Sequence, residues 1–232
     1  MFVPISDENP LRSIQFQYVT IGLIALNVAV FVLEASGLQP GIVAKFAVVP
    51  YTLLKVSVVG GSAIGPSEGL AVPEGYTLLS YMFLHGDILH LTGNLLFLWV
   101  FGDNVEDALG HVRFLAFYLV CGVAAGLAHA FMQPDSNIPL IGASGAVAGV
   151  IAAYLILHPR VRVWVLVFRF IPVRISAALA LGAWILTQIV MLLLPEGDLI
   201  AWWAHVGGLM AGAVLVLIMR RRGVRLFDGG LV

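Results

Sequence analysis

Long apolar stretches, separated by short polar or Pro- and Gly-rich segments, make up most of this chain of 232 residues. A helix needs roughly 20 predominantly apolar residues to cross about 30 Å of hydrocarbon. The pattern therefore predicts six membrane-spanning helices in one all-α polytopic bundle, of which the second and fourth are short. Their predicted ranges are 17–36, 87–101, 112–132, 141–157, 175–194 and 200–219.

The longest connection between predicted spans, residues 38–75, contains several prolines and glycines and cannot form one long helix. Its first half is nevertheless strongly apolar. Apolar segments that do not form one continuous helix are packed on protein or lie at the membrane surface. We therefore expect this loop to lie at the membrane interface.

Composition agrees with a membrane protein, because 60% of the residues are hydrophobic and only 11% are charged. An ordinary soluble domain carries about 25% charged residues. The net charge of −1, without a basic patch away from the membrane flanks, argues against a nucleic-acid partner. Cys121 is the single cysteine, which excludes an intramolecular disulfide and a zinc site built from cysteines.

The basic residues orient the predicted bundle, because Lys and Arg concentrate in cytoplasmic loops. In a six-span arrangement only Lys45 and Lys55 fall on one side of the membrane, and all other basic residues fall on the opposite side. We therefore expect both termini in the cytoplasm, and we expect an integral protein of a prokaryotic plasma membrane. The cytoplasmic set is Arg12, Arg113, Arg160, Arg162, Arg169, Arg174, Arg220, Arg221, Arg222 and Arg225.

Four polar residues inside the predicted spans are candidates for function: His90, Asn94, Ser144 and His205. Polar side chains inside a bilayer are costly, and their presence there is a hypothesis of function by default. From the predicted entry points of the spans, all four lie roughly 6–12 Å below the outer surface, at 1.5 Å per residue. Three separate spans thus bring polar groups to one depth.

Small residues predict which spans touch. Gly145 and Gly149 follow Ser144, and Gly208 and Gly212 follow His205. Glycines four residues apart let membrane helices approach closely. The fourth and sixth spans should therefore meet, bringing the serine hydroxyl to the imidazole. Such a pair is the minimal activated nucleophile for acyl transfer.

Structural interpretations compete with this one. A lone serine in a membrane helix usually bonds back to its own helix, and a single His or Asn is often a packing residue. We interpret His85 as a surface residue or as support for the site. The acidic residues after the second span are interpreted as a solvated loop; they are Asp103, Glu106 and Asp107.

At this point the sequence resembles the rhomboid intramembrane serine proteases over roughly residues 76–215. Each motif is weak alone, but their order, spacing and span placement agree with the family. The motifs are Phe83-Leu84-His85, His90-x-x-x-Asn94, Gly142-x-Ser144-Gly145 and Ala204-His205-x-Gly207-Gly208.

The resemblance implies a six-span bundle with Ser144 as nucleophile and His205 as base, without a third acid. It implies that His90 and Asn94, with the backbone N–H of Ser144, form the oxyanion hole. It implies no cofactor and no metal, and substrates that are transmembrane segments of other proteins in the lipid bilayer. Ala148 stands where the family often has an aromatic residue that packs on the histidine, so the resemblance does not say what holds His205 in place.

The predicted organisation is a short cytoplasmic segment at 1–16, a catalytic domain at 17–219 and a cytoplasmic tail at 220–232. Two other functions stay open. An inactive rhomboid-like binding or quality-control protein would be expected to lack the serine or the histidine, and this chain keeps both. A transporter, with His90, Asn94 and His205 along a substrate path, would be supported by inverted repeats, and we find none. The sequence does not predict the oligomeric state.

Overall fold

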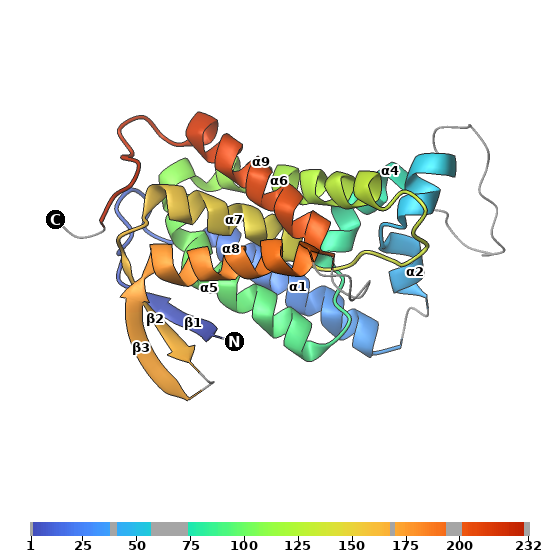
Figure 1. Cartoon of the computed structure of the whole chain (residues 1–232), viewed down its shortest axis with the longest axis horizontal. Coiled ribbons are helices and arrows are strands. Elements are labelled where there is room, and N and C mark those ends of the chain that lie inside the picture. The colour runs from blue at the N-terminus through green and yellow to red at the C-terminus, as the bar shows by residue number, and fades with distance from the viewer. Residues whose placement is uncertain (1, 38–40, 57–73, 168–169, 194–200, 230–232) are drawn as a thin grey trace.

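The computed structural model describes residues 2–37, 41–56, 74–167, 170–193 and 201–229. Most of these residues are helical, and the helices form one bundle with a small sheet at one end (Figure 1). The elements in chain order are β1 (Phe2–Asp7), α1 (Tyr18–Ala35), α2 (Ile42–Phe46), η1 (Thr52–Val56), α4 (Glu74–Ser80), η2 (Tyr81–Phe83), α5 (Ile88–Leu109), α6 (His111–Met132), α7 (Ser144–Leu157), β2 (Arg162–Val167), β3 (Ile171–Ser176), α8 (Ala177–Leu193) and α9 (Trp202–Met219).

A helix lies at each predicted span, and most ends agree within a few residues. Among the described helices, α1, α6 and α9 are long and apolar enough to cross a membrane, whereas α7 and α8 are apolar but shorter. The clear departure is α5, which continues to Leu109 instead of ending near residue 101. Residues 38–40 and 57–73 of the long loop lie outside the described residues, and its described part contains the short helices α2 and η1 and the start of α4.

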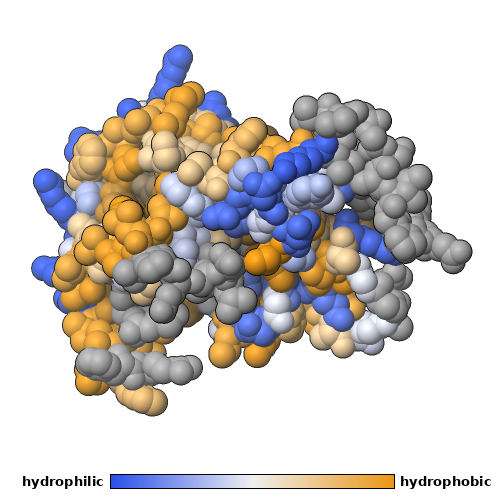
Figure 2. Space-filling view, turned by 45° about the vertical axis from the view of Figure 1, so that its right-hand side comes forward, coloured by the Kyte–Doolittle hydropathy of each residue, from blue (hydrophilic) through white to orange (hydrophobic). Residues whose placement is uncertain are grey.

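The outer faces of the bundle are apolar, as lipid contact requires. In α1 the fully buried residues are Thr20, Leu23 and Asn27, while Val32 is 60% exposed. Exposed leucines occur on α8 in the same way, with Leu186 as an example. Figure 2 shows hydrophobic residues over much of the visible surface, with hydrophilic residues at the top, along the left edge and near the middle of the view.

A three-stranded antiparallel sheet corrects the expectation of an all-α fold. The order is β1-β2-β3, so the N-terminal strand adds to the hairpin that joins α7 to α8. Strand β1, which lies within the predicted segment 1–16, is therefore part of the folded body (Figure 1). Tyr154 near the end of α7 donates a hydrogen bond of 2.5 Å to Asp7 of β1. Burial raises the pKa of Asp7 to about 6, so this carboxyl keeps its proton to a higher pH than a free aspartate does.

The acidic residues at the end of α5 are not a solvated loop, as the sequence suggested. Glu106 is fully buried and accepts hydrogen bonds from the backbone N–H groups of Val19 and Thr20. These N–H groups belong to the first turn of α1, where no partner exists within the helix. Asp107 accepts backbone hydrogen bonds from the chain just before α1, including one from Ile14 at 2.7 Å. The two carboxylates thus fix the N-terminus of α1 on α5.

Candidate active site

Ser144 and His205 lie within hydrogen-bond distance, although 61 residues separate them in the chain. The Nε2 atom of His205 is 2.8 Å from the Oγ atom of Ser144. Ser144 is the first residue of α7, and His205 lies in the first turn of α9 and is only 8% exposed. The predicted meeting of these two side chains is present in the structure.

The close contact of α7 and α9 follows from the facing glycines, as predicted. A Cβ atom built on Gly208 would lie 1.9 Å from the carbonyl oxygen of Gly145. One built on Gly212 would lie 2.2 Å from the carbonyl oxygen of Gly149. Real Cβ atoms are never found so near a backbone oxygen, so only glycine permits this distance between the helices.

The N-terminus of α7 gives Ser144 a favourable electrostatic position. The first N–H groups of a helix have no partner within it, and the helix dipole places partial positive charge there. Gly142, two residues earlier, has a φ of +116°, a conformation that side chains rarely permit. Its N–H donates to the carbonyl oxygen of Tyr81 at 3.0 Å, which fixes the chain just before the serine.

His90 and Asn94 lie beside the same turn. A Cβ atom on Gly142 would be 2.6 Å from Nε2 of His90 and 3.9 Å from Nδ2 of Asn94. Both side chains therefore flank the peptide that leads to Ser144. The start of α5 is fixed by Asp87, which accepts hydrogen bonds from the N–H groups of His90 and its neighbour Leu89, each at 2.8 Å.

His85 supports the candidate donors and is buried, with 3% of its surface exposed. Its Nε2 atom lies 3.1 Å from Nδ2 of Asn94, and its ring centroid lies 5.1 Å from that of His90. Asn94 has Nδ2 as its only donor group, so this contact makes Nε2 of His85 the acceptor. Of the two interpretations of His85, the supporting role agrees with this geometry.

Three side chains surround His205, and sequence reasoning missed all of them. Trp184 of α8 and Trp202 of α9 each have ring centroids 5.9 Å from the imidazole. Gln188 of α8 is 5% exposed, and its Oε1 atom lies 2.7 Å from Nδ1 of His205. These contacts hold the imidazole in place, a role that the small side chain of Ala148 cannot fill. A signal was available, because Gln188 is an amide inside an apolar run.

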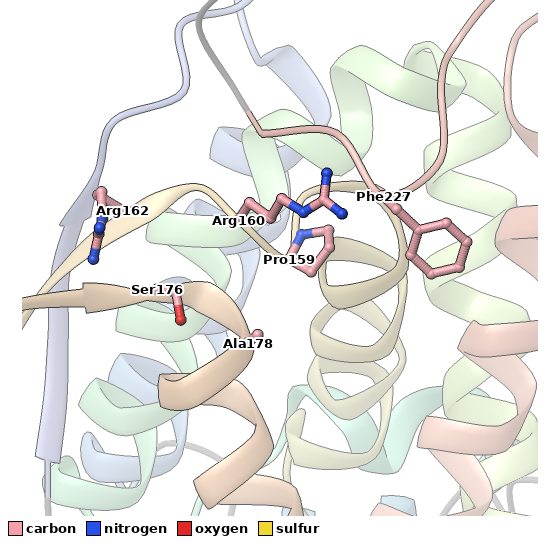
Figure 3. A pocket seen from close by; sticks show the side chains of 6 residues that line it. All are labelled: Pro159, Arg160, Arg162, Ser176, Ala178 and Phe227. Carbon is pink, nitrogen blue, oxygen red and sulfur yellow. The ribbon is translucent and has the colours of Figure 1, made fainter.

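A hollow among the described residues lies away from this site. It has a volume of about 590 Å³ and is found near the end of α7 that is opposite Ser144 (Figure 3). At 1.5 Å per residue, the 14 residues of α7 separate its two ends by roughly 20 Å. The hollow is therefore not the place where Ser144 would meet a substrate. Its lining residues are Pro159, Arg160, Arg162, Ser176, Ala178 and Phe227.

Comparison with known proteins decides the family. A family model described as the Rhomboid domain matches residues 72–222, which is more than half of the chain. The chain belongs to the rhomboid family. Rhomboid proteins are integral membrane proteins and generally serine proteases, although inactive homologues exist.

Curated rhomboid relatives come from a plant, a bacterium and a yeast. RHOMBOID-like protein 5 of Arabidopsis thaliana is 30% identical over 68% of this chain and 49% of its own length. The rhomboid protease GluP of Bacillus subtilis is 38% identical over 40% of this chain and 18% of its own length. Rhomboid protein 1, mitochondrial, of Saccharomyces cerevisiae is 28% identical over 62% of this chain and 41% of its own length. The chain therefore spans less than half the length of each of these relatives.

Proposed function

We propose that this rhomboid protein is an intramembrane serine endopeptidase that cleaves transmembrane segments of other membrane proteins. The observation that carries the proposal is the distance of 2.8 Å between Ser144 Oγ and His205 Nε2 at the N-terminus of α7. A serine held beside a histidine base is an activated nucleophile. The family, generally one of serine proteases, supports peptide bonds as the target.

The proposed reaction has two halves. In the first, Nε2 of His205 takes the hydroxyl proton while Oγ of Ser144 attacks the substrate carbonyl carbon. His205 then gives the proton to the leaving amide nitrogen, the C–N bond breaks, and an ester on Ser144 remains. In the second half His205 takes a proton from a water, which attacks the ester carbon. The ester C–O bond then breaks, His205 returns the proton to Oγ of Ser144, and the new carboxyl end is released. No other reactant is required.

The negative charge on the carbonyl oxygen needs donors that are in position before the reaction. We assign this role to the His90 and Asn94 side chains together with the backbone N–H of Ser144. All three groups belong to the region around Gly142, and the positive end of the α7 dipole adds to their effect.

Replacing the Asn94 side chain is predicted to reduce catalysis without unfolding the bundle. Losing one oxyanion donor typically costs about 10²–10³ in kcat. We therefore expect Asn94→Ala and His90→Ala each to lower kcat for a single-span reporter in this range, with the double variant lower still. Thr92→Val, on the same helix, removes an exposed hydroxyl and is the control. Normal turnover by a folded double variant would contradict the assignment.

We also propose how the helices span the membrane and on which side the termini lie. The six helices α1 and α5–α9 would each span the bilayer as a catalytic unit of residues 17–219, in a prokaryotic plasma membrane. The N-terminal segment and the tail 220–232 would lie on the cytoplasmic side. The substrates would be helices that unwind readily, since a helical carbonyl must be released before attack. Helix-breaking or small residues near the cleavage site should favour this step.

Two exposed positions test this topology. Asn137 follows α6 on the proposed outer side, and Arg225 follows α9 on the cytoplasmic side. In a Cys121→Ala background, Asn137→Cys should react with an impermeant maleimide in intact cells, and Arg225→Cys should react only after lysis. The opposite pattern would reverse the proposed orientation.

A fluorophosphonate probe separates the protease from the other two hypotheses. The probe reacts covalently with activated serines, so we expect modification of Ser144 in the folded protein, located by peptide mass spectrometry. An inactive rhomboid-like protein or a transporter needs no such reactivity. A folded protein that leaves Ser144 unmodified would contradict the protease function.

A further inference from the structure

The side chain of Gln188 contacts His205 on the side of the imidazole ring away from Ser144. We propose that Gln188 is a positioning residue that fixes the tautomer and the ring orientation of His205 for catalysis. The proposal rests on the proposed function of Ser144 and His205. It is carried by the hydrogen bond between Gln188 Oε1 and His205 Nδ1, which joins α8 to α9.

The orientation of the Gln188 amide is set by its own helix. Its Nε2 group donates to the carbonyl oxygen of Trp184 and to the hydroxyl oxygen of Thr187, each at 3.0 Å. Thr187 donates its only hydroxyl proton to the same carbonyl oxygen, at 2.6 Å, and is therefore an acceptor toward Gln188. The NH₂ group thus faces two acceptors, and Oε1 is the atom that faces His205.

An oxygen that only accepts determines where the imidazole proton lies. Oε1 of Gln188 has no proton to donate, so Nδ1 of His205 carries the proton and donates it. In the neutral ring, Nε2 then has the lone pair, and this is the atom 2.8 Å from Ser144 Oγ. The proposed general base is in this way held in the reactive tautomer.

A neutral amide suits this location better than a carboxylate does. Helix α8 is apolar around Gln188, and Leu186 and Ile189 are exposed on its other faces. An ionised residue within a membrane helix is costly. The glutamine supplies the acceptor that orients His205 without placing a permanent charge there. Its stabilisation of the imidazolium is correspondingly weaker than that of a carboxylate.

The alternative is that Gln188 only satisfies a buried donor and holds α8 against α9. Loss of that contact would lower stability, or change how substrates bind, without altering the proton transfer. Activity alone does not separate the two roles. The separating quantities are the division of the effect between kcat and KM and the pH dependence of kcat/KM.

The test compares Gln188→Leu with Gln188→Glu in proteoliposomes, with a single-span reporter. Leucine removes the acceptor, and we expect kcat to fall about 10- to 100-fold with little change in KM. The loss should be smaller than the factor of about 10⁴ seen when the tautomer is inverted. Glutamate restores an acceptor, so kcat should recover toward wild type. Its carboxylate favours the imidazolium, so the acidic limb of the kcat/KM profile should move to higher pH.

Ile189→Met is the matched control, since it changes the neighbouring exposed side chain on the same helix. If Gln188→Leu does not fold, Gln188→Met takes its place, because it keeps a similar length and its thioether sulfur is only a weak acceptor. A folded variant with unchanged kcat, or with an effect on KM alone, would overturn the positioning role. So would a glutamate variant that recovers nothing.

Failure of this proposal is distinguishable from failure of the proposed protease. If the wild-type protein cleaves the reporter and Ser144→Ala does not, the protease stands whatever Gln188→Leu does. If Ser144→Ala cleaves as well as wild type, the proposed protease function fails. The comparison at Gln188 then no longer concerns this reaction.

Discussion

Replacing Ser144 or His205 by alanine should reduce reporter cleavage to background, and the double variant should be no worse than either single one. The two side chains act in one step, and removal of either abolishes that step. Their separation of 2.8 Å in the structure is the basis for treating them as a unit. Initial rates of reporter cleavage in proteoliposomes would measure the effect of each change.

Labelling adds an independent measure of the same pair. An unassisted hydroxyl is a weak nucleophile near neutral pH, so fluorophosphonate modification of Ser144 should disappear in His205→Ala. Thermal stability in detergent must stay close to wild type for each variant. If folded His205→Ala still cleaves and is still modified at Ser144, another residue is the base.

A larger side chain at Gly208 should separate α7 from α9 and disable the site. A Cβ atom there would lie 1.9 Å from the carbonyl oxygen of Gly145, and a backbone atom cannot move aside as a flexible side chain can. Overpacking typically costs about 1–3 kcal/mol and occasionally more, so for Gly208→Val we expect a loss at the upper end, about 3 kcal/mol. Because His205 lies one turn earlier on α9, cleavage should be lost as well.

The matched control for this prediction is Gly22→Val on α1, since a Cβ atom at Gly22 would meet nothing within 4 Å. Thermal unfolding in detergent and reporter cleavage should both distinguish the two valine variants. A Gly208→Val protein with wild-type stability and activity would show that the helices do not pack through this glycine.

Much of the fold was predictable because its signals are local. Apolar runs of sufficient length marked helices α1 and α5 to α9. Glycine spacing predicted which two helices meet, and the close approach of Gly208 to Gly145 confirms it. The second predicted span began at residue 87, next to the start of α5, where the Asp87 side chain accepts two backbone hydrogen bonds.

The features that were missed depend on partners distant in the chain. The sheet is built from three strands of six residues each, and strand β1 pairs with a segment about 160 residues later. The sequence predicted Glu106 and Asp107 to be solvated. Their partners, the N–H groups around the start of α1, lie far away in the sequence. Gln188 was noticeable as an amide within the apolar helix α8, but only tertiary packing identifies His205 as its partner.

Cleavage of a purified single-span reporter in proteoliposomes, with the products analysed by mass spectrometry, tests the protease most directly. We expect cleavage at a peptide bond inside or at the edge of the reporter's transmembrane segment, and no product with Ser144→Ala. Intact reporter in the presence of folded wild-type protein across a panel of such segments would contradict the proposed function. Equal cleavage by folded Ser144→Ala would contradict the assignment of the nucleophile.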